Sequence, residues 1–165
     1  MSIKHALLAL LLDEPRSASQ LQSRFADTTA GVWPLNIGQV SQTLGRLQRD
    51  GHIESAGTII GPTGHSAERY QLTDTGRALV NDWFITPVVQ PVAERDELVT
   101  KVTLAQTRPE LDLIHLLDTQ RASIMEELRA LNRRTRYLPD TRTTDRLLVE
   151  KRIFELEAQA RWLRS

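Results

Sequence analysis

Residues 35–72 constrain the fold of this chain more than any other segment. They begin LNIGQVSQTLGRLQRDGHIES and continue through GPTGH to ERYQL. Asn36 can cap a helix, and Gln39 stands at the reciprocal position of a capping box. Gly51 can end that helix in the left-handed conformation. Two strand-like runs, Ile53–Ile60 and Glu68–Leu72, then flank a turn rich in glycine and proline. The segment therefore predicts a helix followed by a β-hairpin.

The predicted helix has an apolar face and a polar face. At 3.6 residues per turn, the apolar stripe consists of Ile37, Val40, Leu44 and Leu47. The opposite side carries Gln39, Gln42, Arg46 and Arg49. Glutamine amides can bond a base edge in two places, and guanidinium groups bind guanine or phosphate. Such a face is also what a solvated helix shows, so the interpretation depends on the neighbouring elements.

Those neighbours complete a recognisable motif. Ser17 and Gln20 form a predicted capping box at the start of a helix that precedes the polar-faced one. Thr73 is predicted to cap a further helix after the hairpin. Two short helices followed by a hairpin indicate a winged helix-turn-helix, which places its second helix in the DNA major groove.

Composition sets limits on that interpretation. The 165 residues have a formal net charge of zero, and residues 1–82 contain seven Lys/Arg against eight Asp/Glu. Attraction to phosphate supplies much of the affinity for DNA, so a neutral domain is expected to bind weakly and in a salt-sensitive way. The absence of cysteine excludes disulfides and thiolate metal sites. No apolar run approaches the roughly 20 residues that span a bilayer, which predicts a cytoplasmic protein.

The second half of the sequence is helical. Pro87 and Pro91 suggest a division into a winged-helix domain (1–86), a linker (87–94) and a helical dimerisation domain (95–165). Two long amphipathic helices are predicted at about 110–136 and 144–163. Their apolar residues favour a two-fold homodimer, with an intramolecular hairpin as the alternative. The residues predicted to hold the dimer are Ile114, Leu117, Ile124, Leu128, Leu131, Ile153, Leu156 and Leu163.

The order of these segments resembles the PadR family of transcriptional regulators. MSIKHALLALLLDEPRSASQLQ, IGQVSQTLGRLQRDGHIES and ERYQLTDTGRALV carry the resemblance in the first half, and RDELVTKVTLA and LLDTQRASIMEELRAL carry it in the second. It implies a mainly α-helical fold: a winged-helix domain joined to C-terminal dimerisation helices. It also implies a homodimeric repressor that binds a near-palindromic operator and responds to a small aromatic or lipophilic molecule.

The resemblance assigns residues to these roles. The DNA-reading helix would present Gln39, Ser41, Gln42, Thr43, Arg46 and Arg49, and the wing would present His65 and Arg69. Ser41 stands where many relatives have tyrosine, which reduces both reach and stacking surface at that position. The aromatic residues that could line an effector pocket, or else pack in the core, are Trp33, Trp83 and Phe84.

Two other classes of function compete with this interpretation. A winged-helix sensor or interaction protein without sequence-specific DNA binding would fit the neutral charge and Ser41. An enzyme is poorly supported, because the four histidines are scattered and the sequence contains no H-E-x-x-H, G-x-S-x-G or P-loop motif. The sequence accordingly predicts no catalytic residues, no metal and no cofactor.

Overall fold

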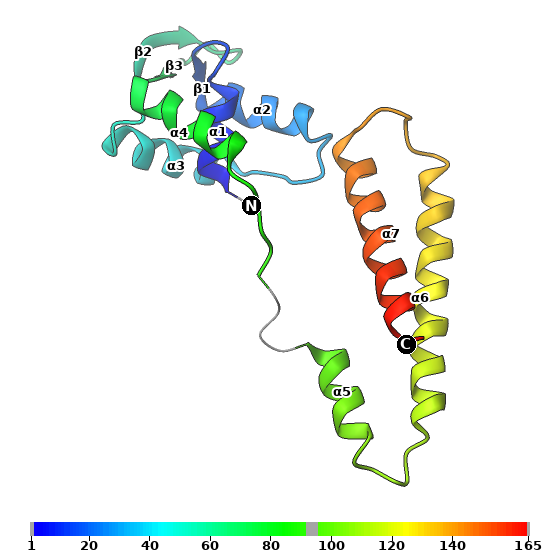
Figure 1. The fold of residues 1–165 in the computed structure, drawn as a ribbon. Coiled ribbons are helices and arrows are strands. Elements are labelled where there is room, and N and C mark those ends of the chain that lie inside the picture. The colour runs from blue at the N-terminus through cyan, green and yellow to red at the C-terminus, as the bar shows by residue number, and fades with distance from the viewer. Residues whose placement is uncertain (1, 92–95, 165) are drawn as a thin grey trace. The chain divides into compact units, whose positions relative to one another are not determined.

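The computed structural model describes residues 2–91 and 96–164, which fall into two compact units, residues 1–88 and 89–165. Figure 1 traces both. Residues 92–94 of the predicted linker, and residue 95 where the helical domain is predicted to begin, lie outside the described residues.

Unit 1 is a helical domain with a small antiparallel sheet. Its elements are α1 (Ile3–Leu10), β1 (Arg16–Ser17), α2 (Ala18–Thr28), α3 (Ile37–Arg49), β2 (Ile53–Ile60), β3 (Ser66–Leu72) and α4 (Asp74–Ile85). The predicted caps are confirmed, since Ser17–Gln20 and Asn36–Gln39 both form complete capping boxes and Thr73 caps α4. This order of helices and hairpin confirms the predicted winged helix-turn-helix.

The sheet contains one strand that the sequence did not predict. Its order is β1-β3-β2, and β1 pairs Arg16 with Tyr70 and Ser17 with Arg69. Two residues are too few to show a period, so β1 leaves no pattern in the sequence. Ser17 serves twice: its backbone lies in the sheet, and its hydroxyl accepts from the Gln20 N–H at 3.3 Å. The sheet thereby sets where α2 begins.

The core of unit 1 gathers beneath α3. Val40, Leu44 and Leu47 are at most 1% exposed and pack with Leu7 and Leu8 of α1 in one cluster. Ile37 was predicted to share this stripe, but its side chain is 46% exposed. It is the first residue of α3, one turn before the buried residues. Three apolar positions, not four, therefore hold α3 to the domain.

The end of α3 is joined tightly to the start of α4. Gly51 has φ +78°, and the His52 N–H donates to the Leu47 carbonyl at 2.9 Å, as in a Schellman cap. The hydroxyls of Thr73 and Thr75 both donate to the Gly51 carbonyl, at 2.6 and 2.9 Å. These contacts connect the helix end, β2 and α4 at one point.

Gly76 permits this connection. A Cβ on Gly76 would lie 1.9 Å from the His52 carbonyl oxygen, which no real side chain tolerates. These contacts explain the residue types of the YQLTDTG segment, which helped to carry the family resemblance. Its threonines bind the helix end, and its glycine makes room for the backbone that follows.

Unit 2 contains α5 (Glu97–Ala105), α6 (Leu113–Thr135) and α7 (Thr144–Trp162). The last two pack as a helical hairpin, with a core cluster of Ile124, Leu128, Leu156 and Ala160. The helix predicted from about residue 110 begins at Leu113, because the Asp112 carboxylate caps it through the His115 N–H at 3.0 Å. No helix in the described part of the chain combines the length and apolar character needed to cross a membrane.

Substituting alanine for Gly76 is expected to lower the free energy of unfolding by at least about 1–3 kcal/mol, as overpacking does elsewhere. Gly45→Ala is the matched control, since nothing lies within 4 Å of a Cβ there. Alanine at this mid-helix position should stabilise α3 by about 1 kcal/mol. Urea unfolding of both variants measures the difference. Equal midpoints for Gly76→Ala and the wild type would contradict the close contact.

Candidate nucleic-acid interface

The outer face of α3 is free of the domain core. Ser41, Gln42, Arg46 and Arg49 are all exposed, and so is Gln39. Because Val40, Leu44 and Leu47 anchor the opposite face, α3 presents its polar residues as a row of amide and guanidinium groups. This is the arrangement that a helix needs to reach base edges from the major groove.

The exposed residues of α3 differ in how far their polar atoms are already bonded. The Gln39 carboxamide oxygen accepts from the Asn36 N–H at 3.3 Å, and the Thr43 hydroxyl donates to the Gln39 carbonyl at 2.8 Å. The Gln42 side chain makes no hydrogen bond within the described residues. Gln42 is therefore freer to bind a base edge on both its amide atoms.

The two arginines of α3 also differ. Arg46 could have paired with Asp50 one turn later, yet it makes no ion pair within residues 2–91 and 96–164. Asp50 instead pairs with Arg49 at 3.3 Å, and both side chains are at least half exposed. A pair in that setting contributes little and can be exchanged for another partner. Arg46 is thus the more available cation.

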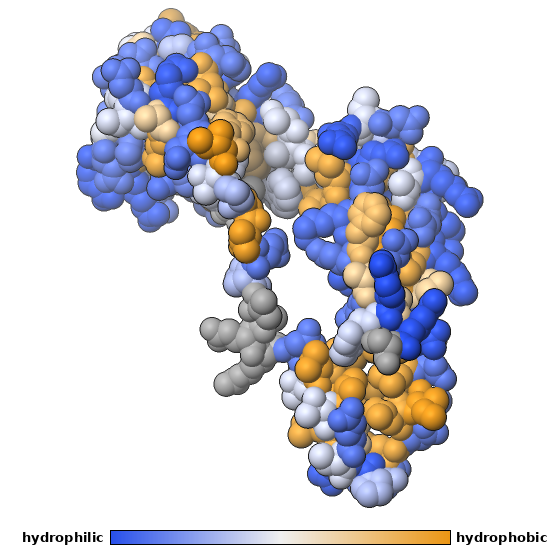
Figure 2. All heavy atoms as spheres, viewed as in Figure 1, coloured by the Kyte–Doolittle hydropathy of each residue, from blue (hydrophilic) through white to orange (hydrophobic). Residues whose placement is uncertain are grey.

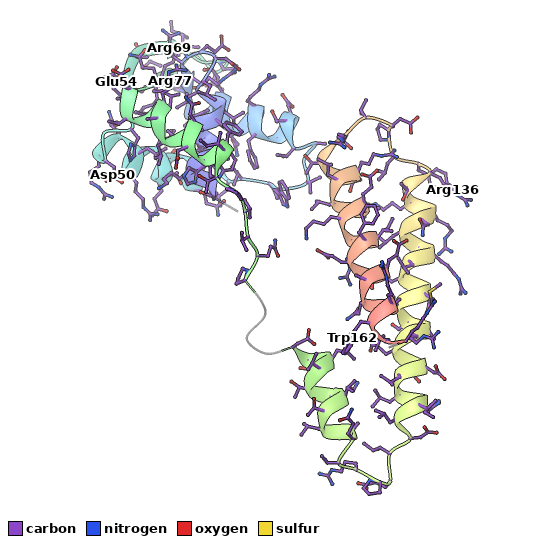
Figure 3. The ribbon with its side chains drawn as sticks, in the orientation of Figure 1. Asp50, Glu54, Arg69, Arg77, Arg136 and Trp162 are labelled. Atoms are coloured by element: carbon purple, nitrogen blue, oxygen red, sulfur yellow. The ribbon has the colours of Figure 1, made fainter. Side chains whose placement is uncertain are left out.

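The wing presents one of its two predicted contacts. His65 is exposed in the turn between β2 and β3. Arg69, by contrast, is half-buried: its Nη2 donates to the Ala56 carbonyl at 3.4 Å, and its Nε is buried without a partner. Ala56 lies in the irregular stretch of β2 between Ser55 and Thr58. Figure 3 labels Arg69 on the sheet. Its Nη2 supports the wing backbone, and a DNA contact from Arg69 stays a prediction.

An aromatic residue and an acidic residue of β3 are bonded to each other. The Tyr70 hydroxyl donates to the Glu68 carboxylate at 3.2 Å. Burial raises the pKa of Tyr70, and the charge of Glu68 beside it adds to the shift. The Glu68 carboxylate therefore already has a partner on its own strand.

The structure contains a hollow between α2 and the wing that the sequence does not predict. It has a volume of about 750 Å³ and is lined by Ser23 and Arg24 of α2 and by Thr63 and His65 of the wing turn, among others. On α2, Ser19 and Ser23 recur four residues apart, as do Gln20 and Arg24. That helical spacing was the available signal. The hollow adds hydroxyl, imidazole and guanidinium groups beside the turn that carries His65.

The three predicted pocket aromatics occupy different environments. The Trp83 ring stacks on His5 with centroids 5.5 Å apart and lies tilted against Phe84 at 4.9 Å. Burial lowers the pKa of His5, and the charge of Lys4 adds to this. Phe84 is 59% exposed, and Trp33 is 39% exposed. Trp83 and Phe84 thus form an aromatic pair at the surface of unit 1.

Most residues predicted to hold a dimer are covered within one chain. Ile124, Leu128 and Leu156 are buried in the α6–α7 core. Partly buried residues packed against it include Leu131, Ile153 and Leu163. Their apolar character is therefore explained by the intramolecular hairpin, the alternative left open by the sequence. Leu117 is half-buried, and Ile114 is 74% exposed.

The fold and the exposed α3 face define a winged helix-turn-helix protein. Residues 7–82 match the family model described as "Transcriptional regulator PadR-like family". The "Negative transcriptional regulator PadR" of Bacillus subtilis (strain 168) is 30% identical over 99 residues. That alignment covers 60% of this chain and 54% of the relative, so it spans about half of the relative's length. Over residues 7–82 the chain is thus similar to the PadR-like family of transcriptional regulators.

Solved structures share the fold along almost the whole chain. Bacillus subtilis PadR in complex with operator DNA has a TM-score of 0.57 at 23% identity, covering 98% of this chain and 95% of that one. The same protein in complex with p-coumaric acid has a TM-score of 0.57 at 21% identity, covering 98% and 94%. At these identities the likeness establishes the fold, including the helical second unit.

Removal of the α3 cap tests how the polar row is held. Asn36→Ala should lower the free energy of unfolding by about 1 kcal/mol, because the Gln39 N–H loses its partner at 2.8 Å. Asn36→Ser should restore most of this loss, since serine also caps. Asn81→Ala on exposed α4 is the control. Urea midpoints measure all three, and an unchanged midpoint for Asn36→Ala would show that the cap contributes nothing.

Proposed function

We propose that this protein is a homodimeric transcriptional repressor that binds operator DNA through α3. The observation that carries the proposal is the exposed outer face of α3, on which the side chains of Gln42 and Arg46 have no partner within the described residues. The Bacillus subtilis relative named as a negative regulator, and its operator complex, support the same role. The protein would act in the cytoplasm, where such an operator is reached.

The mode of reading follows from the geometry of the motif. Two copies of α3 in a symmetric dimer would enter successive major grooves about 34 Å apart and read a near-palindromic site. Gln42 is suited to adenine and Arg46 to guanine, and each bidentate contact is worth roughly 1–3 kcal/mol of discrimination. Because unit 1 is close to neutral, specific contacts of this kind carry more of the affinity than they would in a basic domain.

Replacing Arg46 with alanine should abolish most of the preference for the operator while the dimer stays intact. Loss of a bidentate guanine contact predicts a fall in discrimination of roughly 1–3 kcal/mol. Arg49→Ala is the matched control, and it should weaken all DNA binding slightly without changing preference. Sites are first selected from random duplexes, and competition gel shifts then compare the variants. Unchanged selectivity in Arg46→Ala would remove Arg46 from the reading role.

The same titrations separate this function from its alternative. A winged-helix interaction protein without sequence-specific DNA binding is favoured by the neutral charge of the first 82 residues. If wild-type protein binds no duplex even at low salt, the interaction protein becomes the better description. Salt-dependent binding with a selected consensus supports the repressor.

Dimerisation is proposed to use apolar surface that the α6–α7 hairpin leaves uncovered. Val99 and Leu104 of α5, Leu111, and Ile114 of α6 are between 46% and 74% exposed, and we call them the corner patch. Figure 2 shows apolar atoms gathered over α5 and the start of α6. An exposed apolar patch at a helix corner marks an interaction surface, and a second copy would bury it twice.

A charge placed in the corner patch should separate the dimer. Ile114→Glu is expected to convert dimers to monomers in sedimentation velocity, because an unpaired carboxylate would be buried at the interface. Ser123→Glu is the matched control, since it is exposed and lies half a turn away around α6. Monomeric wild-type protein, or a dimeric Ile114→Glu variant, would contradict this interface.

The proposed effector is a small aromatic acid. The complex of Bacillus subtilis PadR with p-coumaric acid supports this class, and Trp83 with Phe84 offers an aromatic surface. Binding of p-coumaric acid should quench tryptophan fluorescence and release operator DNA. In Trp83→Phe the quenching should weaken, while Trp33→Phe retains it. Quenching that is equal in both variants would place the acid elsewhere.

A further inference from the structure

A hollow lies between α1 and α3, at the edge of the helix face proposed above to read DNA. It has a volume of about 300 Å³ and is lined by Ser2–Lys4 at the start of α1, by Thr43, Arg46 and Leu47 of α3, and by Asp50, which follows α3. We call it the α1–α3 hollow. Thr43 and Arg46 are also members of the row of residues predicted to read DNA. The hollow therefore lies directly beside the polar face of α3.

The charges in the α1–α3 hollow leave two cations available. Lys4 and Arg46 are exposed, and neither makes an ion pair or a side-chain hydrogen bond within the described residues. The carboxylate of Asp50 is paired with Arg49, and the Thr43 hydroxyl hydrogen is donated to the backbone of α3. An anion entering the hollow would meet two positive charges, and the one carboxylate there already has a partner.

The position of Lys4 is set by the domain core. Lys4 lies in the first turn of α1, and Leu7 and Leu8 of the same helix are completely buried. Those two leucines pack in one cluster with Leu44 and Leu47 of α3. The backbone at Lys4 thus keeps a defined place beside α3, and only its flexible side chain moves. A lysine ammonium on such a stem is a point charge suited to phosphate oxygens.

We propose that the α1–α3 hollow binds a phosphate of the DNA backbone through Lys4, while Arg46 at its edge stays directed to the bases. This inference rests on the proposed function, because it requires α3 to lie in the major groove. The phosphates of the two strands line the sides of that groove, so a hollow flanking the polar face of α3 meets one of them. The contact positions the helix and carries no base information.

The site also accounts for DNA binding by a neutral domain. Net charge counts every ionised group, whereas counterion release depends on the cations that contact phosphates. Lys4 is the only lysine among residues 1–82. Its placement beside α3 concentrates positive charge where the duplex would lie, although unit 1 as a whole carries no excess.

The experiment compares Lys4→Gln with the matched control Lys101→Gln, an exposed lysine of α5. Each full-length protein is titrated onto its selected operator and onto an unrelated duplex of equal length, at several salt concentrations. For a dimer that uses both hollows, Lys4→Gln should reduce the slope of log K against log salt by about 1.8. The ratio of the wild-type binding constant to that of this variant should then fall roughly twelvefold between about 50 and 200 mM salt. Lys101→Gln should keep the wild-type slope.

Further readouts separate a phosphate contact from other roles. Lys4→Gln should weaken binding to both duplexes by the same factor, and its melting temperature should equal that of the wild type. Lys4→Arg should restore the wild-type slope. A wild-type slope in Lys4→Gln would overturn the site, as would a loss confined to the operator or a lower melting temperature with unchanged slope. Wild-type protein that binds neither duplex would remove the proposed function itself, a result distinct from failure of the hollow alone.

Discussion

The contact between the start of α4 and the end of α3 is the constraint on which unit 1 depends. The Gly51 carbonyl accepts two threonine hydroxyls, and the backbone at Gly76 lies against the His52 carbonyl. A helix as short as α3 is marginal by itself and needs tertiary support. Its N-terminus is held by a capping box, its middle by buried leucines, and its C-terminus by α4. All three must hold for its polar face to keep one orientation.

Local signals made most of this fold predictable. The helix caps and the helix stop depend on neighbours along the chain, so residue types alone predict them. The caps are at Ser17, Asn36 and Thr73, and the stop is at Gly51. Strand β1 could not be predicted from the sequence, because its pairing with β3 joins residues more than 50 positions apart. Ile37 was misassigned for a related reason: periodicity gives a direction around the helix but not how far along it the core extends.

The candidate site was harder to predict than the fold, because side-chain availability depends on partners that the sequence does not reveal. Arg69 has the residue type of a DNA contact, yet its guanidinium supports the backbone of β2. Lys4 lies 39 residues before Thr43 and was overlooked, although the fold brings both to one hollow. In unit 2 the periodic apolar residues were correctly assigned to helical faces, but most of them pack within the α6–α7 hairpin.

The capping box of α3 has a consequence for how its first turn can read a base. Because the Gln39 carboxamide oxygen is turned back to the Asn36 N–H, its NH₂ group is the part left to point outward. A side chain fixed in this way acts as a hydrogen-bond donor. Its acceptors on the base edges would be purine N7, guanine O6 and thymine O4. Gln42, with no such tether, can adapt to either polarity. Two identical amino acids three residues apart would then tolerate different substitutions in the operator.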